Sequence, residues 1–189
     1  RILGAFADMA GRARAGDTIV FSYAGHGVQL PEALAGDEAD GMDETFILYG
    51  FEMRGPGYGE RIRDNDIAEM LSQVPEDVGV LVIADSCHSG TMTRAVDPRG
   101  ALGRTRWVDV GAPTQPDTLP VPEARTRALE AGDFPNVVFA NAARDDQQTP
   151  EVRIDGDFRG ALSWSIARAL EGAADGGDGA TSLDDLQHF

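Results

Sequence analysis

The only cysteine of this 189-residue chain, Cys87, lies in the stretch LVIADSCHSG, residues 81–90. A single thiol excludes an internal disulfide framework and a cysteine-rich zinc site. It can still be a small buried hydrophobe, a metal ligand or a nucleophile. The residues that follow it, His88, Ser89 and Gly90, do not continue the apolar run. We therefore expect the thiol at the end of a strand, with Gly90 allowing a sharp turn behind it.

A histidine between two glycines, His26 in the stretch AGHG, is the candidate partner of this thiol. A thiol of ordinary pKa is only a few per cent ionised at neutral pH, so a nearby imidazole is needed to take its proton and later to protonate a leaving amine. Backbone N–H groups must also hold the developing oxyanion, and we expect the amides of Gly27 and Cys87 to do so. Two alternatives stay open: His88 as the base, although adjacent side chains at a turn diverge, and His26 as an ordinary turn histidine.

Runs of β-branched and apolar residues alternate with stretches of helical periodicity along the chain. The expected strands are residues 18–23, 45–49, 78–84 and 137–140, and the expected helices are residues 2–14, 64–74 and 160–170. Asp64 is expected to cap the second of these helices. The alternation predicts an α/β domain with a largely parallel sheet. His26 and Cys87 each follow a strand, so if those strands are neighbours, both side chains face one crevice beyond the carboxyl ends.

The formal net charge of −16 restricts the partners of the chain. It argues against nucleic acid, whose phosphates would be repelled, and against anionic membrane surfaces. No run of 18 apolar residues is present, so no membrane span is expected. A cationic substrate or a bound cation would complement the charge, whereas the alternative is a surface that is acidic only for solubility.

One domain is expected over residues 1–171. Residues 97–133 hold five of the ten prolines without sustained periodicity, which predicts a long functional or mobile loop. Residues 172–189 are expected to be a glycine-rich flexible linker followed by a truncated segment. Helical patterns run up to both ends of the chain, so we expect the native protein to be longer.

Four blocks in order, YAGHG, DEADGMDET, DSCHSG and ANAARDDQ, resemble those of the caspase-like cysteine peptidases, specifically the metacaspases and bacterial orthocaspases. The resemblance covers most of residues 1–171. It implies a caspase-like sandwich with a central, mostly parallel sheet flanked by helices, in which the first strand and helix of the family are missing from this chain. It also implies a bacterial, cytoplasmic zymogen in which residues 97–133 form the loop between the two subunits.

The resemblance implies roles for individual residues. His26 corresponds to the base and Cys87 to the nucleophile of the family. Asp85 corresponds to the acidic residue in the pocket for the substrate residue before the scissile bond, which is arginine or lysine in metacaspases. A carboxylate there would pair well with a guanidinium, although Asp85 can also be only a turn cap. Asp146 is a further candidate for substrate binding, and Ala24 stands where many relatives have a polar residue.

Some metacaspases need calcium, and the segment of this chain that resembles their binding residues is Asp64-Asn65-Asp66. Asp64 and Asp66 are therefore candidate calcium ligands. Asn65 and Arg94, which stand where acids would be expected, weaken such a site. The acidic residues between the first two blocks do not have the spacing of an EF-hand loop: Asp37, Glu38, Asp40, Asp43 and Glu44. They can form a solvated rim for basic substrates. No organic cofactor is expected to be required, and Ca²⁺ stays an alternative.

The expected activity is cleavage of protein or peptide substrates after arginine or lysine by a Cys–His dyad. Such an enzyme would find cleavage sites in its own loop, for which the candidates are Arg99, Arg104, Arg106, Arg125 and Arg127. Further domains or an activating protein are possible partners. Two other functions stay open: a caspase-like scaffold that binds proteins without cleaving them, and a different thiol hydrolase or acyltransferase on an α/β sheet.

Overall fold

The computed structural model describes residues 1–31, 42–52, 56–86, 104–105, 134–142 and 150–174, together with residues 179, 181, 182 and 185 near the carboxyl terminus. Three small sheets and three α-helices make up this part of the chain. Among these residues, none of the helices has the length and apolar character needed to cross a membrane.

The central sheet is parallel and contains β1 (Thr18–Ala24), β5 (Gly79–Asp85) and β7 (Val137–Asn141) in the order β1-β5-β7. The middle strand, β5, has the sequence GVLVIAD and is largely buried. Continuous apolar sequence of this kind is typical of a strand covered on both faces. The strands that precede His26 and Cys87 are therefore neighbours, which is the condition under which both residues were expected to face one crevice.

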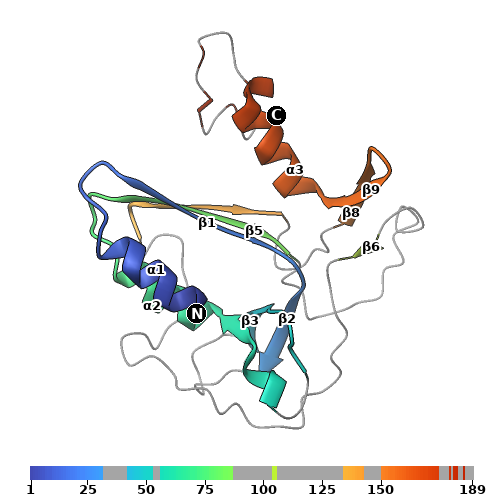
Figure 1. The fold of residues 1–189 in the computed structure, drawn as a ribbon, viewed down its shortest axis with the longest axis horizontal. Coiled ribbons are helices and arrows are strands. Elements are labelled where there is room, and N and C mark those ends of the chain that lie inside the picture. Colours follow the sequence, from blue (N-terminus) through green and yellow to red (C-terminus); the bar gives the residue numbers. More distant parts are fainter. Residues whose placement is uncertain are drawn as a thin grey trace.

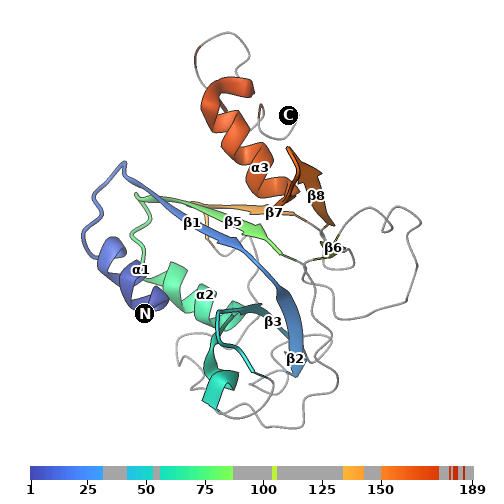
Figure 2. The same cartoon turned by 45° about the vertical axis from the view of Figure 1, so that its right-hand side comes forward.

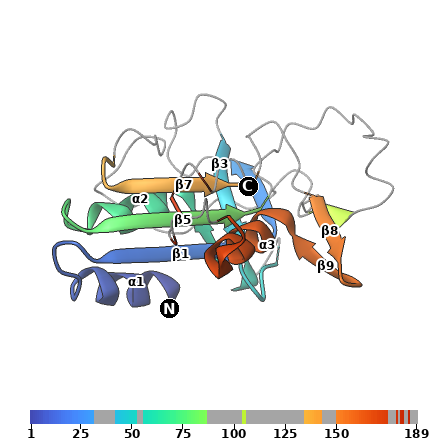
Figure 3. The same ribbon diagram turned by 90° about the horizontal axis from the view of Figure 1, so that it is seen from above.

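Helices cover the central sheet on both sides. Helices α1 (Ile2–Ala10) and α2 (Asp64–Ser72) lie against one face, and α3 (Ala161–Arg168) lies on the opposite side (Figure 1). Seen from above, α3 lies over the sheet toward the carboxyl ends of β1 and β5 (Figure 3). This arrangement confirms the predicted α/β class with a parallel sheet flanked by helices.

The main core lies between the sheet and the pair α1–α2. It contains buried residues from every one of these elements, among them Phe6, Ile19, Ile67, Leu71, Val80 and Val82. Full burial of such a side chain contributes about 1.5–3 kcal/mol. The strands that lead to the site are therefore held by this apolar core.

A second, antiparallel sheet begins directly after the first. Its strands are β2 (Gly27–Pro31), β3 (Met42–Ile47) and β4 (Arg61–Arg63), in the order β2-β3-β4, and η1 (Pro56–Gly59) precedes β4. Figure 2 shows the chain passing from β1 into β2 through a bend. Only Gly25 and His26 separate the two strands, so His26 lies at the joint between the two sheets.

The third sheet contains β6 (Arg104–Thr105), β8 (Pro150–Ile154) and β9 (Asp157–Gly160), and α3 follows it directly and continues into the π-helical segment Ala169–Ala173. The hairpin β8–β9 was not expected from the sequence. Its two-residue turn has Asp155 at φ 55° and Gly156 at φ 92°. An Asp-Gly pair with two positive φ angles is a strong hairpin signal, and the short flanking runs 151–154 and 157–159 alternate polar and apolar residues, so the sequence did carry the signal for this hairpin.

Several predicted boundaries were wrong by a few residues. Helix α1 ends at Ala10 rather than at residue 14, and β3 covers 42–47 rather than 45–49. Asp64 is the first residue of α2 and not its cap. The capping residue is Arg63 in extended conformation, whose backbone N–H donates to the Asp66 carboxylate at 3.0 Å. An acidic residue in the third helical position thus supplies the polar cap.

Candidate active site

The site is built where β1 and β5 leave the central sheet together. Each residue of β1 pairs with the residue of β5 that lies 61 positions later, up to the pair Ala24 and Asp85. His26 and Cys87 are also 61 positions apart, and each follows its strand by two residues. Cys87 itself lies outside the described residues, which end at the buried Ser86 in this part of the chain.

His26 has a firmly held backbone and an exposed side chain. The carbonyl oxygen of His26 accepts a hydrogen bond from the backbone N–H of Ile47 at 3.0 Å. One residue earlier, the Gly25 N–H donates to the Asp85 carbonyl at 3.3 Å, which continues the ladder between β1 and β5 beyond the last paired residues. The imidazole is therefore presented to solvent from a backbone that is bonded to both neighbouring strands.

The geometry around Gly27 bears on the expected oxyanion donor. Hydrogen-bonded and non-hydrogen-bonded residue pairs alternate in an antiparallel ladder. Because Ile47 donates to His26, the pair Gly27 and Phe46 is of the non-hydrogen-bonded kind. The N–H of Gly27 therefore points away from β3, toward the outer side of β2, which is the terminal strand of this sheet. It is a donor that the ladder with β3 does not use.

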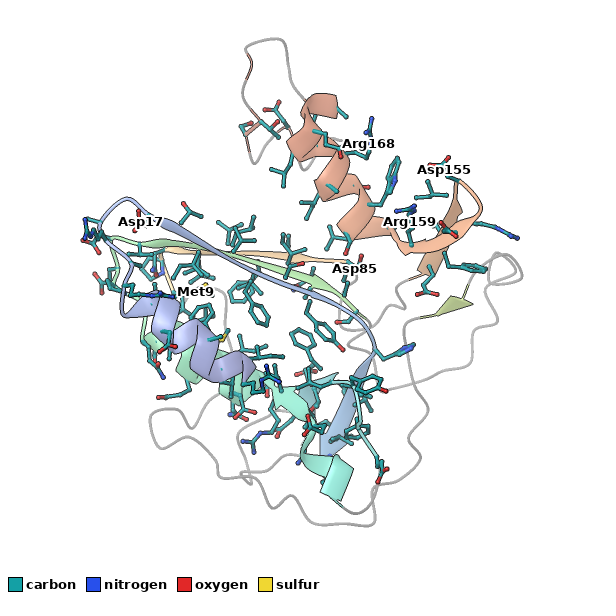
Figure 4. All side chains as sticks on the ribbon, viewed as in Figure 1. Met9, Asp17, Asp85, Asp155, Arg159 and Arg168 are labelled. Atoms are coloured by element: carbon teal, nitrogen blue, oxygen red, sulfur yellow. The ribbon has the colours of Figure 1, made fainter. Side chains whose placement is uncertain are left out.

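Asp85 is fully buried at the end of β5, and its carboxylate reaches across to α3 (Figure 4). The Oδ2 atom of Asp85 accepts a hydrogen bond of 2.7 Å from the backbone N–H of Ser163. Ser163 is the third residue of α3, and the N-cap residue of this helix is Gly160, which has no side chain to cap it. Asp85 thus caps a helix 78 positions away, a role that sequence reasoning missed.

Asp85 also shares a face of the sheet with Ala24, its partner in the ladder. Side chains alternate along a strand, so both lie on the α3 side of the sheet, opposite the main core. The small Ala24 side chain therefore lies next to the carboxylate. The prediction that Asp85 binds a substrate cation stays a prediction.

The candidate calcium ligands are otherwise engaged in the described structure. Both oxygens of Asp66 contact Arg63: Oδ1 accepts from Nη2 at 2.9 Å and Oδ2 from Nε at 3.1 Å. Oδ1 of Asp64 accepts from the Asn65 backbone N–H at 2.8 Å. No cluster of three or more histidine, cysteine, aspartate or glutamate residues that could hold a metal occurs within the described ranges. The Asp66 carboxylate is thus arranged to bind the Arg63 side chain and not a calcium ion.

The remaining acidic candidates divide into two groups. Asp43 is buried, and Glu44 accepts a hydrogen bond from the Gln29 side chain at 2.9 Å. These two acids are therefore part of the second sheet and do not form a solvated rim. Asp37, Glu38 and Asp40 lie outside the described residues.

Other predicted residues also lie outside the part that the structure describes. They are His88, Gly90, Arg94, Asp146, Arg99, Arg106, Arg125 and Arg127. Arg104 is described only through its backbone, in β6. The roles predicted for these residues stay predictions.

Comparison with known proteins identifies the family. A family model described as "Metacaspase, peptidase C14 domain" matches residues 1–96, about half of the chain. Metacaspase-1A of Aspergillus niger is 30% identical over 84% of this chain and 45% of its own length, and Metacaspase-1 of Kluyveromyces lactis is 27% identical over 84% and 42%.

A solved structure, protein GSU0716 from Geobacter sulfurreducens, has a TM-score of 0.65 at 27% identity and covers 91% of this chain and 61% of that one. The chain spans less than half the length of the curated relatives named above. The chain belongs to the metacaspases, the cysteine-peptidase family defined by the peptidase C14 domain.

Proposed function

We propose that the protein is a cysteine endopeptidase that cleaves after arginine or lysine, with Cys87 as nucleophile and His26 as general base. The observation that carries the proposal is the register of β1 and β5, whose offset of 61 residues equals the separation of the two residues. Two strands that leave a parallel sheet side by side bring the residues that follow them to the same edge.

The proposed reaction is acyl transfer in two steps. His26 takes the thiol proton, and the sulfur of Cys87 attacks the carbonyl carbon of the scissile peptide. The oxygen becomes negative and is held by the N–H groups of Gly27 and Cys87. Collapse of this intermediate breaks the C–N bond, and His26 returns the proton to the leaving amine. Water, with His26 again as base, then attacks the thioester, which releases the acid and restores the thiol.

Preference for a cationic side chain is supported by charge and by burial. Asp85 places a fully buried carboxylate two residues before Cys87. A charge of this kind gains most from a partner that is itself desolvated in the same pocket. The net charge of −16 would also attract basic segments of a substrate. Protein or peptide substrates with basic residues are thus the class that the chain is suited to bind.

Peptide cleavage by four matched proteins tests the proposal. Wild type, Cys87→Ala, His26→Ala and His88→Ala are assayed with fluorogenic peptides that differ only in having arginine, lysine or aspartate before the reporter. We expect turnover of the arginine and lysine peptides by wild type and His88→Ala, and none by the other two variants. If His26→Ala keeps its activity and His88→Ala loses it, His88 is the base.

The same assay separates the alternative functions. A folded wild type that turns over none of the peptides would favour a binding scaffold. Labelling of Cys87 by an arginyl chloromethylketone distinguishes the peptidase from another thiol hydrolase, because a non-peptidase site should not react preferentially with the arginyl reagent. Equal labelling by an uncharged reagent would contradict the proposed specificity.

A further inference from the structure

The phenol of Tyr23 lies at the joint between the two sheets, three residues before His26. Its oxygen is 2.8 Å from the carbonyl oxygen of His26 and 2.6 Å from the carbonyl oxygen of Ile47. A phenol has a single proton to donate, so the two carbonyls share one donor. The same His26 carbonyl accepts the Ile47 N–H at 3.0 Å. Tyr23 thus closes a small network of hydrogen bonds around the backbone of His26.

The ring of Tyr23 is itself held in place. It stacks on Phe46, with ring centroids 4.2 Å apart and an angle of 14° between the planes. Phe46 is buried in the main core, and it is the ladder partner of Gly27. A stack of this kind adds to the apolar contact of the two rings. The hydroxyl group is therefore carried on a rigid support that joins β1 to β3.

The neighbouring glycine leaves the space that the phenol occupies. A Cβ atom built on Gly25 would lie 2.5 Å from the Tyr23 hydroxyl oxygen and 2.7 Å from the ring carbon that carries it. Contacts this short do not occur, so any side chain at position 25 would displace the ring or the backbone. Gly25 and Tyr23 are thus matched, and both belong to the segment that carries His26.

We propose that Tyr23 is a positioning residue for His26, acting through the carbonyl group of His26 and not through contact with the substrate. This inference rests on the proposed function, in which His26 is the base. The imidazole is exposed, so its position depends on the hydrogen bonds that hold the His26 backbone. Misplacement of a catalytic group by about 1 Å can cost about 100-fold in rate. The phenol is therefore expected to affect the chemical step more than the binding of substrate.

Tyr23→Phe tests the proposal, since it removes the hydroxyl group and keeps the ring stacked on Phe46. The matched control is Tyr49→Phe, the same change at a fully exposed tyrosine. We expect kcat to fall about 10- to 100-fold in Tyr23→Phe, with KM changed less than about twofold. The control should behave as wild type. If Tyr23→Phe is partly unfolded at the assay temperature, all proteins are compared at a lower temperature at which this variant is folded.

A second readout needs no substrate. The rate at which iodoacetamide alkylates Cys87 is measured across pH, because it reports the thiolate. The profile of Tyr23→Phe should move from that of wild type toward that of His26→Ala. Wild-type kcat and a wild-type profile in a folded Tyr23→Phe would overturn the inference. Identical profiles for wild type and His26→Ala would instead contradict the proposed Cys–His pair, whatever Tyr23 does.

Discussion

Replacing Asp85 by asparagine separates two roles of one buried carboxylate. Asp85 accepts the Ser163 N–H at 2.7 Å, and an asparagine side-chain oxygen can accept the same bond. Asparagine and aspartate cap helices about equally well. The free energy of unfolding of Asp85→Asn should therefore lie within about 0.5 kcal/mol of that of wild type. Asp85→Ala leaves the N–H without this acceptor and should lose about 1–3 kcal/mol.

Activity should respond to the same two variants in a different way. Removal of one member of a buried charge pair costs about 2–5 kcal/mol. At about 1.36 kcal/mol for each factor of ten, kcat/KM for an arginine substrate should fall between about 30-fold and several thousand-fold in Asp85→Asn. The asparagine variant is thus expected to be as stable as wild type but a much poorer enzyme.

The assay compares an arginine peptide with a citrulline peptide, which has nearly the same shape and no charge. Urea denaturation of each variant gives the stability, and Asp8→Asn is the control, since Asp8 is exposed on α1 at the other face of the sheet. Asp85→Asn should bring the two kcat/KM values close together, and Asp8→Asn should leave their ratio unchanged. A wild-type ratio in a stable Asp85→Asn would mean that Asp85 only caps α3 and does not bind the cation of the substrate.

Three further predictions concern the ion pair of Arg63, the effect of calcium and the processing of the chain. Arg63→Ala should lower the free energy of unfolding by about 3 kcal/mol in urea denaturation, because Arg63 is 1% exposed and its loss would strand the Asp66 carboxylate; a loss below about 1 kcal/mol would contradict a buried ion pair. Arg63 already neutralises Asp66, so treatment with a chelator should change neither the melting temperature nor the cleavage of arginyl peptides, and calcium added afterwards should also have no effect. Loss of activity with the chelator and its recovery with calcium would refute this prediction. Active wild type should cut itself after arginines within residues 97–133, as detected by mass spectrometry, whereas Cys87→Ala should stay whole; an intact, fully active wild type would count against processing.

Sequence reasoning succeeded where the information is local. The apolar run of β5 predicted that strand closely, because residues that are buried on both faces of a sheet must be apolar. The β-branched and aromatic run of β1 predicted the neighbouring strand, because such residues favour strands even where one face is exposed. The glycines around His26 marked the end of a strand for a similarly local reason. The hairpin of Asp155 and Gly156 was also encoded locally, by an Asp-Gly turn between two short alternating runs, and sequence reasoning missed it.

The sequence by itself determined which chemical groups are present, namely a thiol, an imidazole and a carboxylate, each at the end of an apolar run. Only the tertiary structure decided what surrounds them. The alignment of β1 with β5, the cap that Asp85 provides for α3 and the bond from Tyr23 to the Ile47 carbonyl all depend on how separate elements pack. Contacts such as that between Asp85 and Ser163 leave no periodic trace in the sequence, because only the fold brings the two residues together.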